Sequence, residues 1–195
     1  MKFTKMHGCG TDYVYVNLFE EKLDDPARVS IYVSDRHFGI GSDGLITIGP
    51  SDKADFRMRI YNADGSEAEM CGNGIRCVAK YVYDHKLTDK TEISVETGAG
   101  IKYLTLYVEE NKVSQVRVDM GEPILTPGDI PVVKADGSAY GDDYRVIDEP
   151  ISAGNREWHM TCVSMGNPHA VVFVDDVAGF ELEKYGPLFE NHKMF

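Results

Sequence analysis

The 195 residues suffice for one domain with a sizeable core or for two small domains. Hydrophobic residues make up 43% and charged residues 27% of the chain, a soluble globular composition, and a formal net charge of −12 argues against nucleic acid or an anionic membrane as the main partner. The start MKFTKMHGCG lacks the apolar run of a signal peptide, and no stretch approaches the roughly 18 apolar residues of a membrane span. We therefore expect a cytoplasmic protein.

Strand patterns open the chain. Alternating side chains predict strands over residues 2–8 and 13–18 around the turn GCGTD. Asp25 has the side chain of a helix N-cap and is followed by proline, which favours a helix over residues 26–36.

Two further strands are predicted after this helix, over residues 43–49 and 55–65. In the second, Phe56, Met58 and Ile60 fall on one face, and turn residues end the pattern. The alternation predicts a sheet with that face in the core.

The pattern changes to a helical one after residue 72. Ile75, Val78, Ala79 and Val82 fall at the i, i+3, i+4 and i+7 spacing of one helical face. We expect a helix with that stripe buried.

Hairpin-connected strands are then predicted over residues 93–100, 101–112 and 113–123. The segment 123–141 is rich in Pro, Gly and Asp and is the best candidate for a domain boundary.

Beyond that boundary, residues 158–166 and 169–176 have strand patterns, and residues 180–195 are helical or irregular. The chain therefore combines separate strands and helices in an α+β fold. The expected division is a first domain over 1–119 and the first part of a second over 120–195.

Four cysteines, at positions 9, 71, 77 and 162, are too sparse for a disulfide scaffold. No Cys-x-x-Cys pair is present, and Cys71 and Cys77 lack the spacing of a zinc site, so no metal is expected. Any function of these thiols should be that of a nucleophile or a base.

Cys71 stands at the start of the second predicted helix. A helix leaves its first backbone N–H groups without partners and carries partial positive charge there, which favours the thiolate form of a cysteine and attracts anions. Gly72 and Gly74 keep side chains away from those groups, so a carboxylate could approach them. The alternative is that Cys71 is a small packing residue beside the core.

Five segments together resemble the diaminopimelate epimerase family: MHGCGTDYVYV, GIGSDGL, NADGSEAEMCGNGIRC, VDMGEP and VSMGNPH. The motif MCGNG alone is less specific, because proline racemase-like enzymes carry a similar MCGHG. The order and spacing of the five segments match the family along the whole chain.

The resemblance implies a cofactor-independent isomerase that converts LL-2,6-diaminopimelate to the meso isomer in lysine and peptidoglycan biosynthesis. It also implies two similar domains, each an antiparallel sheet wrapped around a central helix, with the small-molecule substrate in a cleft between them. The family uses two cysteines as acid and base on opposite faces of Cα, and Cys71 matches one of them. A homodimer is common among relatives.

The same resemblance assigns further substrate contacts. It gives Asn62 and Asn167 side-chain hydrogen bonds to the substrate, and Gly72 and Asn73 backbone N–H groups for its α-carboxylate. His169 matches a family histidine that modulates the pKa values of the catalytic thiols.

Two positions depart from the family pattern, and one segment is absent. Thr11 stands where the family usually has a substrate-binding Asn, and Gly44 stands where some members have Gln. In the family the second catalytic cysteine lies in a segment after the position of Phe195. Cys162 is no substitute, because no glycine-flanked helix start follows it. We therefore expect these 195 residues to lack full activity.

Three alternatives remain open at this stage. The chain could be a non-catalytic fragment that binds an amino-acid carboxylate at Cys71. It could be a proline racemase-like isomerase, or a thiol hydrolase with Cys71 as nucleophile.

Overall fold

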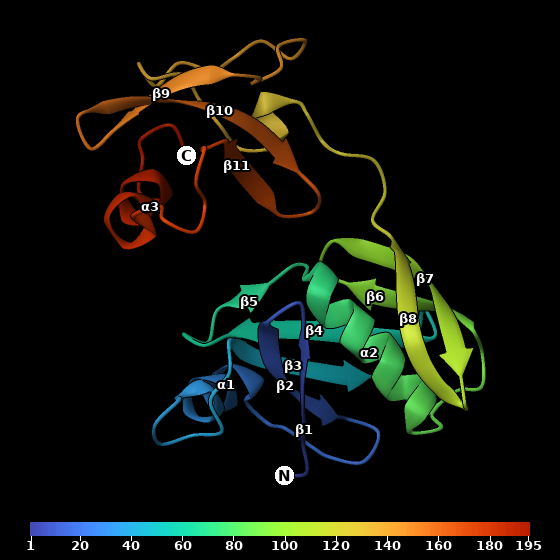
Figure 1. The fold of residues 1–195 in the computed structure, drawn as a ribbon. Coiled ribbons are helices and arrows are strands. Elements are labelled where there is room, and N and C mark those ends of the chain that lie inside the picture. Colours follow the sequence, from blue (N-terminus) through green and yellow to red (C-terminus); the bar gives the residue numbers. More distant parts are fainter. The chain divides into compact units, whose positions relative to one another are not determined.

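The computed structural model describes all 195 residues, which divide into two compact units, Met1–Met120 and Gly121–Phe195. Each unit combines a sheet with helices (Figure 1). The helices are α1 (Pro26–Ser34), α2 (Gly72–Asp84) and α3 (Leu182–Glu190), with the short 3-10 helix η1 (Pro127–Asp129). The predicted α+β class is confirmed.

The first unit holds an eight-stranded sheet in the order β1-β2-β3-β4-β6-β7-β8, with β5 paired to β4. Its strands are β1 (Thr4–Gly8), β2 (Thr11–Asn17), β3 (Gly44–Gly49), β4 (Phe56–Asn62), β5 (Glu67–Ala68), β6 (Glu92–Thr97), β7 (Gly100–Glu109) and β8 (Lys112–Asp119).

The sheet is mixed, whereas the expected sheet was antiparallel. The pairs β2–β3 and β4–β6 run parallel, and the other pairs of this sheet run antiparallel. Parallel neighbours need a crossover connection. Here α1 supplies it between β2 and β3, and α2 lies on the connection from β4 to β6.

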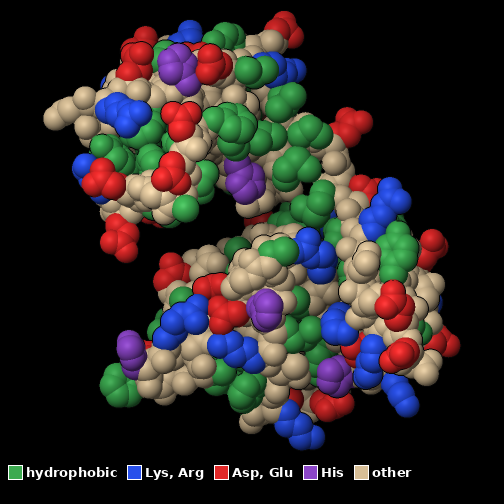
Figure 2. Space-filling view, viewed as in Figure 1, with side chains coloured by type: hydrophobic (Ala, Val, Ile, Leu, Met, Phe, Trp, Pro, Cys, Tyr) green, Lys and Arg blue, Asp and Glu red, His purple; other side chains and the backbone are tan.

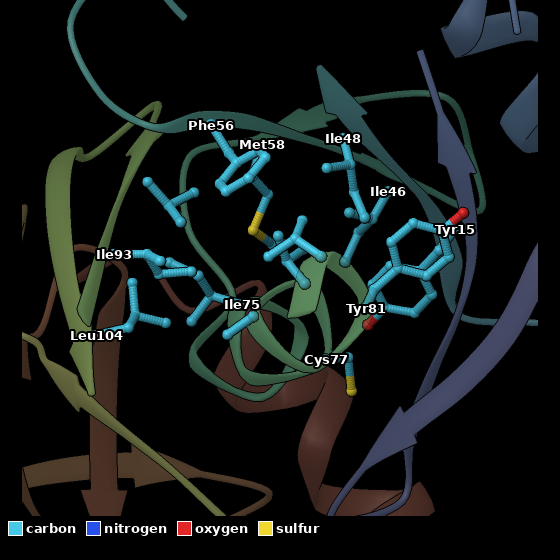
Figure 3. Packing of buried hydrophobic residues seen from close by; sticks show 14 of the residues in the cluster. Tyr15, Ile46, Ile48, Phe56, Met58, Ile75, Cys77, Tyr81, Ile93 and Leu104 are labelled. Atoms are coloured by element: carbon cyan, nitrogen blue, oxygen red, sulfur yellow. The ribbon is translucent and has the colours of Figure 1, made fainter. Parts of the chain in front are cut away.

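Helix α2 lies in the curl of this sheet (Figure 1). Its predicted stripe is confirmed, since Ile75, Val78, Ala79 and Val82 are all fully buried. They pack against buried side chains from β2, β3, β4, β6 and β7 (Figure 3). Each large aliphatic side chain buried in this way contributes about 1.5–3 kcal/mol, so this face fixes α2, and with it the α2 N-terminus.

Helix α1 covers the opposite face of the sheet, which leaves β2 and β3 buried on both sides. The predicted N-cap is confirmed, because the Asp25 side chain accepts a hydrogen bond of 3.1 Å from the Arg28 backbone N–H. The helix ends two residues before the predicted end at Arg36. Asp35 leaves the helical conformation, and its carboxylate accepts two 2.7 Å hydrogen bonds from backbone N–H groups in the following turn.

The second unit has a three-stranded antiparallel sheet in the order β11-β10-β9. Its strands are β9 (Glu149–Ala153), β10 (Arg156–Ser164) and β11 (Pro168–Val172), and β9 was not predicted. Helix α3 confirms a helix in the final stretch. Trp158 on β10 is surrounded by the rings of Phe180, Tyr185 and Phe189, which attach α3 and the segment before it to the sheet.

Acidic and basic side chains are interspersed over the visible face of the molecule (Figure 2). No helix is long and apolar enough to cross a membrane.

Candidate functional site

Cys71 is the N-cap residue of α2. Its backbone is extended, with φ −140° and ψ 105°, and its Sγ accepts a hydrogen bond of 3.3 Å from the Gly74 backbone N–H. The side chain is half-buried and packs against the core under α2. The sequence placed Cys71 at the helix start, and the structure shows the sulfur itself capping the helix.

The two glycines after Cys71 have different physical reasons. A Cβ on Gly72 would meet only the Met120 side chain, at 3.8 Å, so this position opens the helix end. A Cβ on Gly74 would lie 2.7 Å from Ile46 Cδ1 and 3.4 Å from Cys71 Sγ. Close packing beneath the sulfur therefore favours glycine at position 74, whereas Gly72 keeps the approach to the helix end clear.

Asn73 is held between two partners. Its Nδ2 donates to Thr11 Oγ1 at 3.0 Å, and its Oδ1 accepts from Arg76 Nη2 at 2.5 Å. Close by, a Cβ on Gly8 would lie 2.8 Å from the Asn73 carbonyl oxygen, so β1 ends directly against the helix start. The Thr11 hydroxyl is thus engaged inside the protein, where it holds the side chain of Asn73 at the start of α2.

Asn62 ends β4 at the turn into β5. Its Nδ2 donates to Ser66 Oγ at 3.0 Å, and its backbone oxygen accepts from Ser30 Oγ at 2.8 Å. It lies opposite Gly44 in the β3–β4 register. These bonds match a turn residue, and the role of Asn62 as a substrate ligand remains a prediction.

Tyr13 on β2 is a neighbour of Cys71 that the sequence reasoning missed. Burial raises the pKa of Tyr13 well above its ordinary value, and the nearby Cys71 sulfur raises it further. The alternation in TDYVYVN could have indicated it, because it places Tyr13 and Tyr15 on the face that meets α2.

The other three cysteines have different surroundings. Burial raises the pKa of Cys77, which lies in the body of α2. Burial, and then the Glu149 carboxylate, raise the pKa of Cys162 to about 11. Cys9 is exposed in the β1–β2 turn, where Arg76 Nη2 lies 3.5 Å from its Sγ.

Asn167 and His169 belong to the second unit, at the turn from β10 into β11. The Asn167 carbonyl accepts from the Met165 N–H at 3.2 Å, and His169 pairs with Val163 across the strands. His169 lines a hollow of about 570 Å³ together with Cys162, Pro168, Phe189 and Phe195. The structure places Asn167 in the turn and His169 on β11, and their roles toward a substrate remain predictions.

The helix start can therefore perform two tasks. Its unpaired N–H groups can bind a carboxylate, and its capping sulfur can accept or give a proton beside that carboxylate. No group of three or more His, Cys, Asp or Glu side chains is arranged to hold a metal ion.

The sequence comparisons all match proteins of one family. A sequence model of the family described as diaminopimelate epimerase matches residues 3–126. A diaminopimelate epimerase from Agathobacter rectalis is 99% identical over all 195 residues, which cover 68% of that protein. One from Methanococcus maripaludis strain C5 is 58% identical with the same coverage.

Solved structures share the fold at low sequence identity. A hydroxyproline epimerase from Agrobacterium vitis, solved with trans-4-hydroxy-L-proline, superposes with a TM-score of 0.60 at 14% identity, covering 87% of this chain and 50% of that one. A PhzF-family protein from Bacillus anthracis superposes with a TM-score of 0.55 at 19% identity, covering 88% and 56%.

Proposed function

The chain belongs to the diaminopimelate epimerase family of isomerases, and from this premise we propose that it acts on 2,6-diaminopimelate with Cys71 as one of two acid/base thiols. The observation that carries the proposal is the position of Cys71 as the N-cap of α2, with its sulfur beside open backbone N–H groups. The pathway would be lysine and peptidoglycan biosynthesis.

The first step is carboxylate binding. The α-carboxylate of the substrate accepts hydrogen bonds from the N–H groups of Gly72 and Asn73, where the helix dipole favours negative charge. The open side of Gly72 admits it, and the bonds from Thr11 and Arg76 to the Asn73 side chain hold that residue in place.

The second step is proton transfer. The Cys71 thiolate takes the proton from Cα, which leaves a thiol on the protein and a carbanion on the substrate. The negative charge that spreads onto the carboxylate is stabilised by the N–H groups that already bind it. This transfer draws on no cofactor.

Inversion needs a second acid on the opposite face of Cα. Cys71 is the one cysteine of the 195 residues that caps a helix. The family resemblance places the second cysteine after Phe195, so the 195 residues supply one of the two groups in this proposal.

Formation of the meso isomer in deuterated water tests the proposal. The 195-residue chain, incubated with LL-diaminopimelate in deuterated water, should not form the meso isomer at the rates of full-length relatives. The same chain extended by the remaining third of the Agathobacter relative should form it, and Cys71→Ser should slow that reaction at least about 1,000-fold. Cys9→Ser is the matched control for an exposed thiol, and equal loss in both variants would overturn the assignment of Cys71.

A second candidate is binding without turnover, which the open position at Gly72 favours. Calorimetry with diaminopimelate tests it. Gly72→Ala should leave the unfolding midpoint near the unmodified value, since a Cβ there meets only one flexible side chain, and should weaken binding. The absence of any binding heat counts against this candidate.

Three further parts of the proposal concern the rest of the molecule. Asn167 and His169 should contribute to substrate binding and to control of the thiols, so Asn167→Ala should raise KM and His169→Asn should shift the pH profile of kcat in the extended chain. A cytoplasmic location is supported by the four free thiols. A homodimer should appear as twice the chain mass in light scattering.

A further inference from the structure

Arg76 determines which end of the Asn73 side-chain amide faces which partner. A guanidinium carries only hydrogen-bond donors, so the Asn73 atom that lies 2.5 Å from Arg76 Nη2 is the amide oxygen, Oδ1. The amide nitrogen, Nδ2, therefore faces Thr11 Oγ1 at 3.0 Å and donates to it. Exchanging the two ends would bring the NH2 group against the guanidinium, donor against donor. The polarity of this amide is thus set by Arg76.

The same reasoning locates the proton of the Thr11 hydroxyl. A hydroxyl has one proton to donate and two lone pairs with which to accept. One lone pair of Thr11 Oγ1 accepts from Asn73, so the hydroxyl proton points away from Asn73. Thr11 is half-buried, and its hydroxyl donates to no acceptor within the chain. This proton is therefore available to a group from outside the chain.

Thr11 begins β2 directly beside the start of α2. It pairs with Gly8 at the end of β1, and a Cβ on Gly8 would lie 2.8 Å from the Asn73 carbonyl oxygen. The β1–β2 turn thus packs against the first turn of α2, where Gly72 leaves the helix end open. The Thr11 hydroxyl and the first backbone N–H groups of α2 lie at one place in the fold.

Arg76 has no carboxylate partner. It is half-buried, it forms none of the ion pairs of the chain, and the other side chain that Nη2 contacts is Cys9, with Sγ at 3.5 Å. Its guanidinium reaches back to the positive end of the helix dipole, where a cation is disfavoured. Helix stability therefore does not explain this arginine, whereas the bond to Asn73 gives it a task.

We propose that Arg76 is a positioning residue that orients the Asn73 amide so that the Thr11 hydroxyl donates to the carboxylate of the ligand. The inference rests on the proposed function in placing that carboxylate at the N–H groups of Gly72 and Asn73. Thr11 then supplies a third donor, from a side chain, beside the two from the backbone. Arg76 acts through the amide and does not itself bind the ligand.

The KM of the extended chain for LL-diaminopimelate tests this inference. Thr11→Val removes the donor and should raise KM about tenfold, because a hydrogen bond to a charged group is of that strength. Thr11→Ser keeps the hydroxyl and should leave KM near the unmodified value. Since the carboxylate carries its charge before proton transfer, kcat should change much less than KM. An unchanged KM in folded Thr11→Val overturns the inference.

A double-mutant cycle shows whether Arg76 acts through Thr11. Arg76→Met lets the Asn73 amide turn over and accept the Thr11 proton, so KM should rise several-fold. In the Thr11→Val background the same change should have an effect of under about twofold, because no proton is left to orient. Arg76→Lys still presents only donors and should leave KM near the unmodified value. Equal effects of Arg76→Met in both backgrounds would show that its charge acts directly on the ligand, which contradicts the proposal.

Two further variants complete this experiment. Lys22→Met removes one positive charge from a side chain that is 90% exposed, and as the matched control it should leave KM unchanged. Arg76→Gln covers the case in which Arg76→Met does not fold. Glutamine can accept from the Asn73 amide nitrogen, so KM should rise in this variant as well, and an unchanged KM counts against the inference.

NMR spectra of the ligand-free chain separate this inference from the proposed function. The Asn73 side-chain amide proton that is donated to Thr11 should move upfield in Thr11→Val and stay in place in Thr11→Ser. If these results and the KM results hold while Cys71→Ser leaves the extended chain active, the proposed catalytic role fails and the orientation of Asn73 stands. If Cys71→Ser inactivates the extended chain while Thr11→Val changes neither the spectrum nor KM, the inference fails and the proposed function stands.

Discussion

The relative reactivity of the four thiols directly tests whether the position of Cys71 at the start of α2 activates its sulfur. The perturbation is alkylation of the folded chain by iodoacetamide near neutral pH. We expect Cys71 to react faster than Cys77 and Cys162, since the thiolate is the reactive form and only Cys71 stands at a helix N-terminus.

The expected difference can be worked from the surroundings of each sulfur. Burial, and then Glu149, raise the pKa of Cys162 to about 11. An ordinary thiol has a pKa near 8.5, so the thiolate fraction of Cys162 is roughly 300-fold below that of an ordinary thiol at the same pH. Burial also raises the pKa of Cys77 and shields it from the reagent. Cys71 should therefore react at least about 100-fold faster than Cys162.

The assay has an internal reference and a control. Cys9 is exposed and serves as the reference thiol in the same digest. Labelling in concentrated urea is the control, because all four rates should converge once the fold is lost. Equal rates for Cys71 and Cys77 in the folded protein would refute the helix-end argument.

Three other predictions concern stability. Val78→Ala should lower the free energy of unfolding by about 2 kcal/mol in urea titrations, because Val78 is fully buried, whereas Lys22→Ala at an exposed position should change it by under about 0.5 kcal/mol. Thr11→Val removes the hydroxyl that accepts a hydrogen bond from the side-chain amide at position 73, and it should lower the free energy of unfolding by about 1 kcal/mol. Thr11→Ser keeps this hydroxyl and should retain the stability of the unmodified chain. Hydrogen bonds from Arg36, and then a lysine ammonium, hold the pKa of Asp12 far below its ordinary value, so its charge stabilises the fold above about pH 4 and this contribution is lost as the pH falls toward the lowered value. Asp12→Asn should therefore destabilise the chain at pH 7, and the difference should shrink at pH 2 to 3 in the same titrations.

The sequence predicted elements whose pattern is local. The stripe from Ile75 to Val82 and the cap at Asp25 depend on residues a few positions apart, and both are present. The directions of β3 and β6 depend on which strands the crossovers join, which no local pattern records. The mixed sheet was therefore found only in the structure.

The features of the candidate site likewise divide into those that local sequence predicts and those that depend on the fold. The position of Cys71 at a helix start could be predicted because the glycines and the apolar stripe adjoin it in the chain. The hydrogen bond with Thr11 and the packing of Tyr13 in the cluster beneath Cys71 come from β2, about 60 residues earlier, and depend on how the strands are arranged. These interactions could therefore be identified only from the structure.

Three glycines meet at the helix start for three different reasons, and none of them adopts a left-handed conformation. Gly8 admits the Asn73 carbonyl, Gly74 admits Ile46 beneath the sulfur, and a Cβ at Gly72 would only touch the flexible Met120 side chain. A packing residue would not need an open neighbour, because a side chain at position 72 would cost no room and would spare the entropy of a glycine. The room that Gly72 leaves beside the flexible Met120 side chain supports our proposal that a ligand approaches the N–H groups beside Cys71, and with it a chemical role for this cysteine.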